Sequence, residues 1–179
     1  MTKTAYMFPG QGAQFVPMGR DLYESFAVCR SVFDRAESAC GLPIKKLCFE
    51  GPLEELSQTN FSQPALVATS IAALAAARET RLTQPDFMFG LSLGEYSALC
   101  AAGALSLEDP VRLVKIRGEA MQQAALQNPG GMSSIIGASH EDVLSVVEKA
   151  SKFGVIGVAN FNSPGQIVIS GQISALDEA

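Results

Sequence analysis

Short apolar runs alternate with segments of helical periodicity along the first 128 residues. Thr4 to Phe8 predicts a strand that Pro9-Gly10 ends, and Phe87 to Phe89 predicts a second strand. The turn residues of 60–64 predict a loop. Apolar side chains recur every three or four positions elsewhere, which predicts helices over residues 21–39, 65–77 and 109–126. Strands that alternate with helices favour an α/β fold whose mostly parallel sheet is covered on both faces.

The last fifty residues have a second pattern. Asn128 to Gly131 is typical of a boundary between domains. After it, the pattern predicts a strand, a helix that Ser139 opens, and two more strands, over residues 132–136, 140–150, 155–159 and 166–170. This β-α-β-β order is the first part of a split β-α-β unit, whose final helix and strand are missing before Ala179. We therefore predict two domains, residues 1–128 and residues 129–179, the second of them incomplete.

The segment around Ser92 contains the clearest chemical motif. Gly90-Leu91-Ser92-Leu93-Gly94 lies between an apolar run and an alanine- and leucine-rich helical pattern, which predicts strand, sharp turn and helix. Such a turn holds its serine in a strained backbone conformation, with the hydroxyl above the sheet at the positive end of a helix. The N–H of Leu93 can then face an oxyanion on an attacked carbonyl. The alternative is a serine that only caps the helix.

Two further positions are candidates for binding a ligand. The glycines of the loop from Gly10 to Gln14 let a ligand approach the backbone, where the Gln11 amide offers a donor and an acceptor, although an ordinary turn explains the loop equally well. Arg117 lies within the apolar stripe of the helix over 109–126. The members of this stripe are Leu113, Val114, Ile116, Ala120, Met121 and Ala124. A guanidinium there is costly unless an anion meets it, either an internal partner such as Glu95 or an anionic ligand.

Composition narrows the classes of function. The chain is 47% hydrophobic and 17% charged, which predicts a folded globular protein. Its net charge of −5 and single basic pair, Lys45-Lys46, argue against a nucleic-acid or anionic membrane surface. We find no apolar run long enough for a membrane span and no signal-peptide pattern, and expect a cytoplasmic protein. The four cysteines lack metal-ligand spacing, so we expect reduced thiols and neither metal nor cofactor.

Five motifs in order resemble those of one enzyme family. They are FPGQGAQ (Phe8 to Gln14), SQPAL (Ser62 to Leu66), GLSLGEYSAL (Gly90 to Leu99), LVKIRGEAMQ (Leu113 to Gln122) and NFNSPGQIVISG (Asn160 to Gly171). Together they resemble the bacterial malonyl-CoA:acyl-carrier-protein transacylases of fatty acid synthesis and, more distantly, the acyltransferase domains of polyketide synthases. The resemblance extends to residue 179. It implies a larger α/β subdomain similar to that of hydrolases, with a nucleophile elbow, and a smaller ferredoxin-like subdomain.

The resemblance also implies an activity and its residues. Ser92 is the implied nucleophile, Arg117 the implied clamp for the free carboxylate of the malonyl group, and Gln11 and Leu93 the implied donors of oxyanion-hole N–H groups. The malonyl group passes from malonyl-CoA to Ser92 and then to the phosphopantetheine thiol of acyl carrier protein, which makes the implied enzyme an acyl-carrier-protein S-malonyltransferase. A buried arginine matched by a carboxylate explains a preference for malonyl over acetyl groups.

Two positions depart from the family pattern. Leu91 stands where the family usually has histidine, at a position that is free in the turn. The family's catalytic histidine lies in a region beyond Ala179, whereas the single histidine here is His140, for which an exposed helix start is the simpler interpretation. We therefore expect the amino-terminal portion of such an enzyme.

Three origins of this portion stay open: a truncated gene product, a piece of a longer protein, or half of a split enzyme that a carboxy-terminal partner region or chain completes. Two other functions also stay open. One is a serine esterase of the α/β-hydrolase type, and the other is a non-catalytic module that binds acyl-CoA or a carrier protein.

Overall fold

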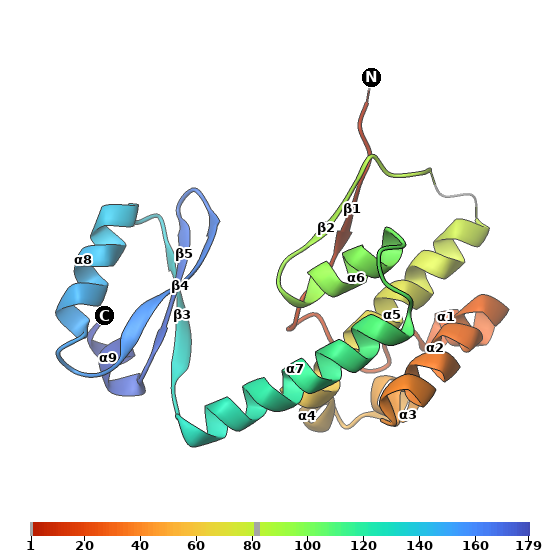
Figure 1. Cartoon of the computed structure of the whole chain (residues 1–179), viewed down its shortest axis with the longest axis horizontal. Coiled ribbons are helices and arrows are strands. Elements are labelled where there is room, and N and C mark those ends of the chain that lie inside the picture. Colours follow the sequence, from red (N-terminus) through yellow and green to blue (C-terminus); the bar gives the residue numbers. More distant parts are fainter. Residues whose placement is uncertain (1, 81–82) are drawn as a thin grey trace. The chain divides into compact units, whose positions relative to one another are not determined.

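The computed structural model describes residues 2–80 and 83–179, which form two compact units (Figure 1). Unit 1 extends to Gln122 and unit 2 runs from Gln123 to Ala179. The division between them falls within the long helix α7 (Glu108–Gln127). The division into domains of residues 1–128 and 129–179 stays a prediction.

Unit 1 contains a sheet of two parallel strands, β1 (Ala5–Phe8) and β2 (Phe87–Gly90), as the α/β pattern predicts. Their inward side chains pack against helices α5 (Thr59–Glu79) and α6 (Leu93–Ala101), through the cluster of Tyr6, Phe8, Leu74, Met88, Ala98 and Ala101. The outward side chains are exposed, with 74% of Met7 and 58% of Phe87 accessible. Within the described residues the helices therefore cover one face of this sheet, and the prediction of two covered faces was wrong.

The remaining helices of unit 1 are α1 (Arg20–Ser25), α2 (Ala27–Cys40), α3 (Ile44–Glu50) and α4 (Leu53–Leu56). A single helix over 21–39 was a wrong prediction, because Phe26 has an extended backbone that separates α1 from α2. A loop over 60–64 was also wrong, because α5 begins at Thr59 and contains Pro64. Proline in the second turn of a helix gives up only one hydrogen bond, here to the Asn60 carbonyl, and the burial of α5 offsets that loss.

Unit 2 is a three-stranded antiparallel sheet in the order β3-β5-β4, with two helices on one face (Figure 1). Its elements are β3 (Gly131–Ile136), α8 (His140–Ala150), β4 (Ile156–Ser163), β5 (Gln166–Gly171) and α9 (Ile173–Glu178). Ile167 and Ile169 alternate along β5 and pack with Val143 of α8. The predicted β-α-β-β order is present, and β4 extends further than predicted because its last residues pair with β5 as a hairpin. The short helix α9 follows β5, so the prediction that the final helix is missing was wrong.

None of the helices within residues 2–80 and 83–179 is long and apolar enough to cross a membrane. The four cysteines are free thiols, and Cys29, Cys40 and Cys48 are buried. Burial raises the pKa of the Cys48 thiol to about 12. These cysteines therefore contribute to the core of unit 1 as small apolar side chains.

The cap of α8 gives a test of unit 2. The Ser139 hydroxyl accepts the Asp142 N–H at 3.1 Å, as the sequence predicts. Replacement by alanine removes this acceptor, and we expect Ser139→Ala to destabilise unit 2 by about 1 kcal/mol. Hydrogen exchange of the α8 amides measures the loss, with Ser133→Ala at an exposed position of β3 as the control. Equal exchange in the two variants would contradict the capping role.

Candidate active site

The turn from β2 into α6 holds Ser92 in a strained conformation. Its φ is 54° and its ψ is −104°, and no other non-glycine residue in the described part of the chain has a positive φ. A backbone of this kind costs about 1–3 kcal/mol and persists only where its surroundings impose it. A Cβ on Gly90 would lie 2.3 Å from the Gly94 carbonyl carbon, and a Cβ on Gly94 would lie 2.3 Å from the Phe8 oxygen. The two glycines therefore let β1, β2 and α6 meet at the turn.

The Ser92 hydroxyl points to a cation and does not cap the helix. Ser92 occupies the N-cap position of α6, yet its side chain makes no capping hydrogen bond, so the capping alternative was wrong. Instead Arg117 Nη2 donates to Ser92 Oγ at 2.7 Å. The backbone N–H of Leu93 and that of Gln11 have no acceptor among the described residues. The loop before Gln11 lies against the turn, since a Cβ on Gly10 would be 3.2 Å from the Leu91 oxygen.

Arg117 reaches this turn because α7 crosses the start of α5 closely. A Cβ on Gly118 would lie 2.7 Å from the Thr59 oxygen and 2.8 Å from Asn60 Cα, so only glycine permits the approach. The buried face of α7 is formed by Pro110, Val111, Val114 and Gly118. The predicted apolar stripe was therefore partly wrong, because Leu113, Ile116 and Met121 are exposed. The half-buried Arg117 lies beside the buried Gly118, at the edge of the packed face.

The guanidinium of Arg117 is held by neutral groups. Nη1 donates to Gln63 Oε1 at 2.7 Å, Nη2 donates to Ser92, and the Tyr96 ring centroid lies 6.0 Å from Cζ. Within the described residues Arg117 forms no ion pair, and the exposed Glu95 is not its partner. Of the two alternatives that the sequence leaves open, the structure disfavours the internal salt bridge.

Sequence reasoning missed Gln63, which lies at the centre of the network. Its side chain is fully buried in α5, and its Nε2 lies 3.4 Å from Gln11 Oε1 and 3.4 Å from Met121 Sδ. Gln11 Nε2 in turn donates to Thr59 Oγ1 at 3.2 Å. The loop predicted over 60–64 concealed this residue, and its place in the SQPAL motif was the available signal.

The two other positions discussed from the sequence, Leu91 and His140, are not part of the hydrogen-bond network around Arg117. Leu91 is 61% exposed in the turn. His140 is the exposed first residue of α8 in unit 2, as predicted, and its ring stacks on Phe161 with centroids 4.8 Å apart.

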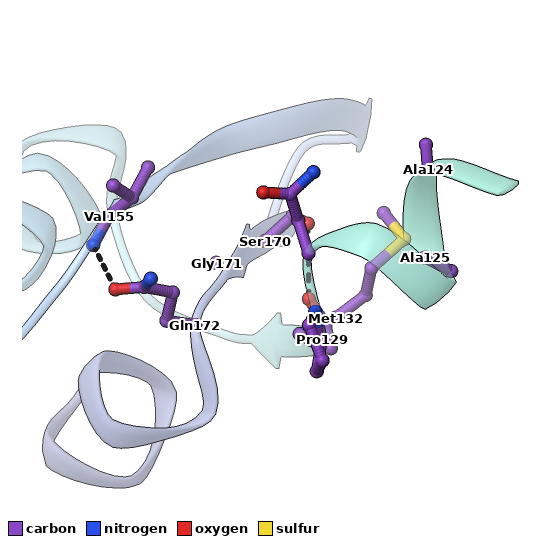
Figure 2. A pocket seen from close by; sticks show the side chains of 11 residues that line it. Ala124, Ala125, Pro129, Met132, Val155, Ser170, Gly171 and Gln172 are labelled. Carbon is purple, nitrogen blue, oxygen red and sulfur yellow. Dashed lines mark hydrogen bonds between the residues drawn. The ribbon is translucent and has the colours of Figure 1, made fainter.

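A cavity of about 500 Å³ in unit 2 has no titratable side chain in its lining (Figure 2). Two hydrogen bonds lie within its lining: the Val155 N–H donates to Gln172 Oε1 at 3.0 Å, and Ser170 Oγ donates to the Gly131 carbonyl at 3.0 Å. The cavity therefore offers no candidate for catalysis.

Comparison with known proteins decides the family. The profile of the acyl transferase domain matches residues 5–179. The chain belongs to the acyl transferase domain family. It is 46% identical over 180 residues to the malonyl CoA-acyl carrier protein transacylase of Bacillus subtilis (strain 168). That alignment covers all of this chain and 56% of the relative. It is 41% identical over 179 residues to the Escherichia coli (strain K12) transacylase of the same name, 58% of which it covers.

Solved structures agree with this membership of the acyl transferase domain family. The malonyl CoA-acyl carrier protein transacylase of Clostridium perfringens superposes with a TM-score of 0.90 at 43% identity, over 99% of this chain and 56% of that one. A malonyl-transacylase in complex with a type II polyketide synthase acyl carrier protein gives a TM-score of 0.90 at 38% identity, over 99% and 57%. This acyl transferase chain thus spans a little over half the length of these relatives.

The crossing at Gly118 gives a test of the site. An alanine at an exposed helix position stabilises relative to glycine by about 1 kcal/mol. At Gly118 the added methyl would meet backbone atoms, so we expect Gly118→Ala to destabilise unit 1 by about 1–3 kcal/mol. Urea unfolding measures the change. Gly157→Ala is the control, since a Cβ there meets nothing within 4 Å. If Gly118→Ala is more stable than the parent chain, α7 and α5 do not approach each other as closely as described.

Proposed function

We propose that this chain performs the loading chemistry of malonyl transfer in fatty acid biosynthesis, in the cytoplasm. In this proposal Ser92 takes the malonyl group from malonyl-CoA and passes it to the phosphopantetheine thiol of acyl carrier protein. The names of its relatives, which include malonyl CoA and acyl carrier protein, support this choice of substrates. The most direct observation is the 2.7 Å contact between Arg117 and Ser92 Oγ. One methylene separates the malonyl carboxylate from the carbonyl that Ser92 attacks, so a cation beside Oγ is well placed for that carboxylate.

The proposed reaction divides transfer into two acylations. Ser92 Oγ forms a bond to the thioester carbonyl, and the negative oxygen that develops is stabilised by the free N–H groups of Leu93 and Gln11. The carbon–sulfur bond then breaks, and the CoA thiolate leaves and takes up the serine proton. The carrier thiol attacks the malonyl ester in the same way and returns a proton to Ser92.

Proton transfer in this scheme needs a group besides Arg117. A guanidinium donates hydrogen bonds but accepts no proton at neutral pH, and the only histidine, His140, stacks on Phe161 in unit 2. We propose that a carboxy-terminal partner region or chain supplies the proton acceptor. A groove of about 670 Å³ beside β1 supports this proposal. Its lining includes Phe15, Met18 and Leu66 together with β1, and within the described residues one edge of β1 has no strand paired with it.

The loading step is tested by the intact mass of the chain after incubation with malonyl-CoA. We expect a malonyl adduct that Ser92→Ala abolishes. Removal of the charge in Arg117→Gln should slow malonyl loading about ten- to hundredfold, because a charge-assisted contact to the carboxylate is lost. Arg112→Gln, at an exposed position of the same helix, is the matched control. Loading from acetyl-CoA should be slow in the parent chain, and Arg117→Gln should not slow it further, because no carboxylate contact is lost.

Other outcomes of the same assay favour the two other functions. Hydrolysis of a neutral ester that is unaffected by Arg117→Gln would indicate an esterase. Saturable binding of malonyl-CoA that requires Arg117 but leaves Ser92 unmodified would indicate a binding module.

The partner proposal has its own test. We expect the carboxy-terminal segment of the Bacillus subtilis transacylase, expressed separately and added to this chain, to accelerate loading of Ser92 at least about tenfold, since general-base catalysis contributes at least that much. Replacing Phe15, which is 58% exposed in the groove, by aspartate should weaken this acceleration. If Ser92 is loaded at the same rate with and without the added segment, the proposal is contradicted.

A further inference from the structure

The contact with Arg117 fixes the orientation of the Gln63 side-chain amide. A guanidinium has donors only, so the atom that faces Arg117 Nη1 at 2.7 Å must be the Gln63 oxygen. The amide nitrogen is thereby directed to Gln11 Oε1 and to Met121 Sδ. The side chain is fully buried, so packing fixes it as well. Gln63 therefore holds Arg117 through one defined neutral oxygen.

The neutrality of this oxygen has an electrostatic consequence. The groups that contact the Arg117 guanidinium are an amide oxygen, a hydroxyl oxygen and an aromatic ring, and none of them has a formal negative charge. The half-buried cation has lost part of its hydration, and no carboxylate within the described residues pairs with it to offset this desolvation. Its charge remains available to an anion.

A glutamate at position 63 would change this balance without a change of shape. Glutamate has the length and branching of glutamine, so its carboxylate would occupy the place of the amide and form a charge-assisted pair with Arg117. The Gln11 amide would turn to donate to the new carboxylate in place of accepting from Gln63. The cation would then be neutralised from inside the protein.

We propose that Gln63 is a specificity-determining residue. By positioning Arg117 with a neutral acceptor, it reserves the positive charge for the free carboxylate of the acyl group, and thus favours carboxylated over neutral acyl groups. This inference rests on the proposed function, and it names the residue that keeps the carboxylate site of that function open.

The experiment measures binding of carbon-13 malonate to the full chain by NMR titration, with acetate as the second ligand. Gln63→Glu should weaken malonate binding at least about tenfold, because its carboxylate competes for Arg117. Gln63→Met keeps a similar length and leaves Arg117 charged, so it should bind malonate within about threefold of the parent. Gln58→Glu adds the same carboxylate at the exposed N-cap of α5 and should bind as the parent does.

Three results would overturn the proposal: a parent chain that does not bind malonate, a folded Gln63→Glu chain that binds as the parent does, or a Gln63→Met chain as weak as Gln63→Glu. Circular dichroism reports folding. If Gln63→Glu does not fold, Met121→Glu takes its place, because it puts a carboxylate one helical turn from Arg117 at a partly exposed position, and it should weaken malonate binding likewise. Loading from malonyl-CoA, run in parallel, separates the two hypotheses. Malonate binding that depends on Gln63 without any adduct on Ser92 would remove the proposed function and leave the role of Gln63 in place.

Discussion

The close contact between Gly94 and the Phe8 carbonyl is the constraint on which the candidate site depends. It brings the first strand against the first turn of α6, and the second strand must then reverse within a few residues. Ser92 takes up that reversal with a positive φ, at a cost that only tight packing on both sides can impose. The strain therefore comes from strand and helix packing, and its result is a hydroxyl that stands clear of the helix it precedes.

A second close approach, at Gly118, places the cation. Without a side chain there, α7 passes directly over the backbone at the start of α5, and residues on the two helices come within hydrogen-bonding distance. The site thus depends on two glycine contacts made by different pairs of elements. Both contacts involve backbone atoms, which move less easily than side chains, and this makes the 2.7 Å contact between Arg117 and Ser92 a property of the scaffold.

What could be predicted from the sequence was local. The turn around Ser92 and the cap at Ser139 have short signals whose geometry follows from a few neighbouring residues. The break at Phe26, the start of α5 and the buried face of α7 depend on packing partners far along the chain, which periodicity does not reveal. Gln63 was hidden for the same reason, since proline is ordinarily a helix breaker and only the burial of α5 keeps the helix intact around Pro64. Arg117 was found because a charge in an apolar stripe is conspicuous, but its neutral partners could not be deduced.

The arrangement of charge also separates two tasks that a nucleophilic site must perform. A guanidinium beside Oγ favours negative charge on that oxygen and attracts a carboxylate, yet it cannot accept the proton that the hydroxyl must lose. In the proposed reaction, recognition of an acidic acyl group can therefore be complete within unit 1 while deprotonation requires another residue. A single cation that contacts both the nucleophile and the ligand's carboxylate couples them, because an anion that draws Arg117 toward itself weakens the hydrogen bond to Ser92. In the proposed reaction, binding of the correct acyl group would thus free the hydroxyl for attack, while a neutral acyl group would leave it held.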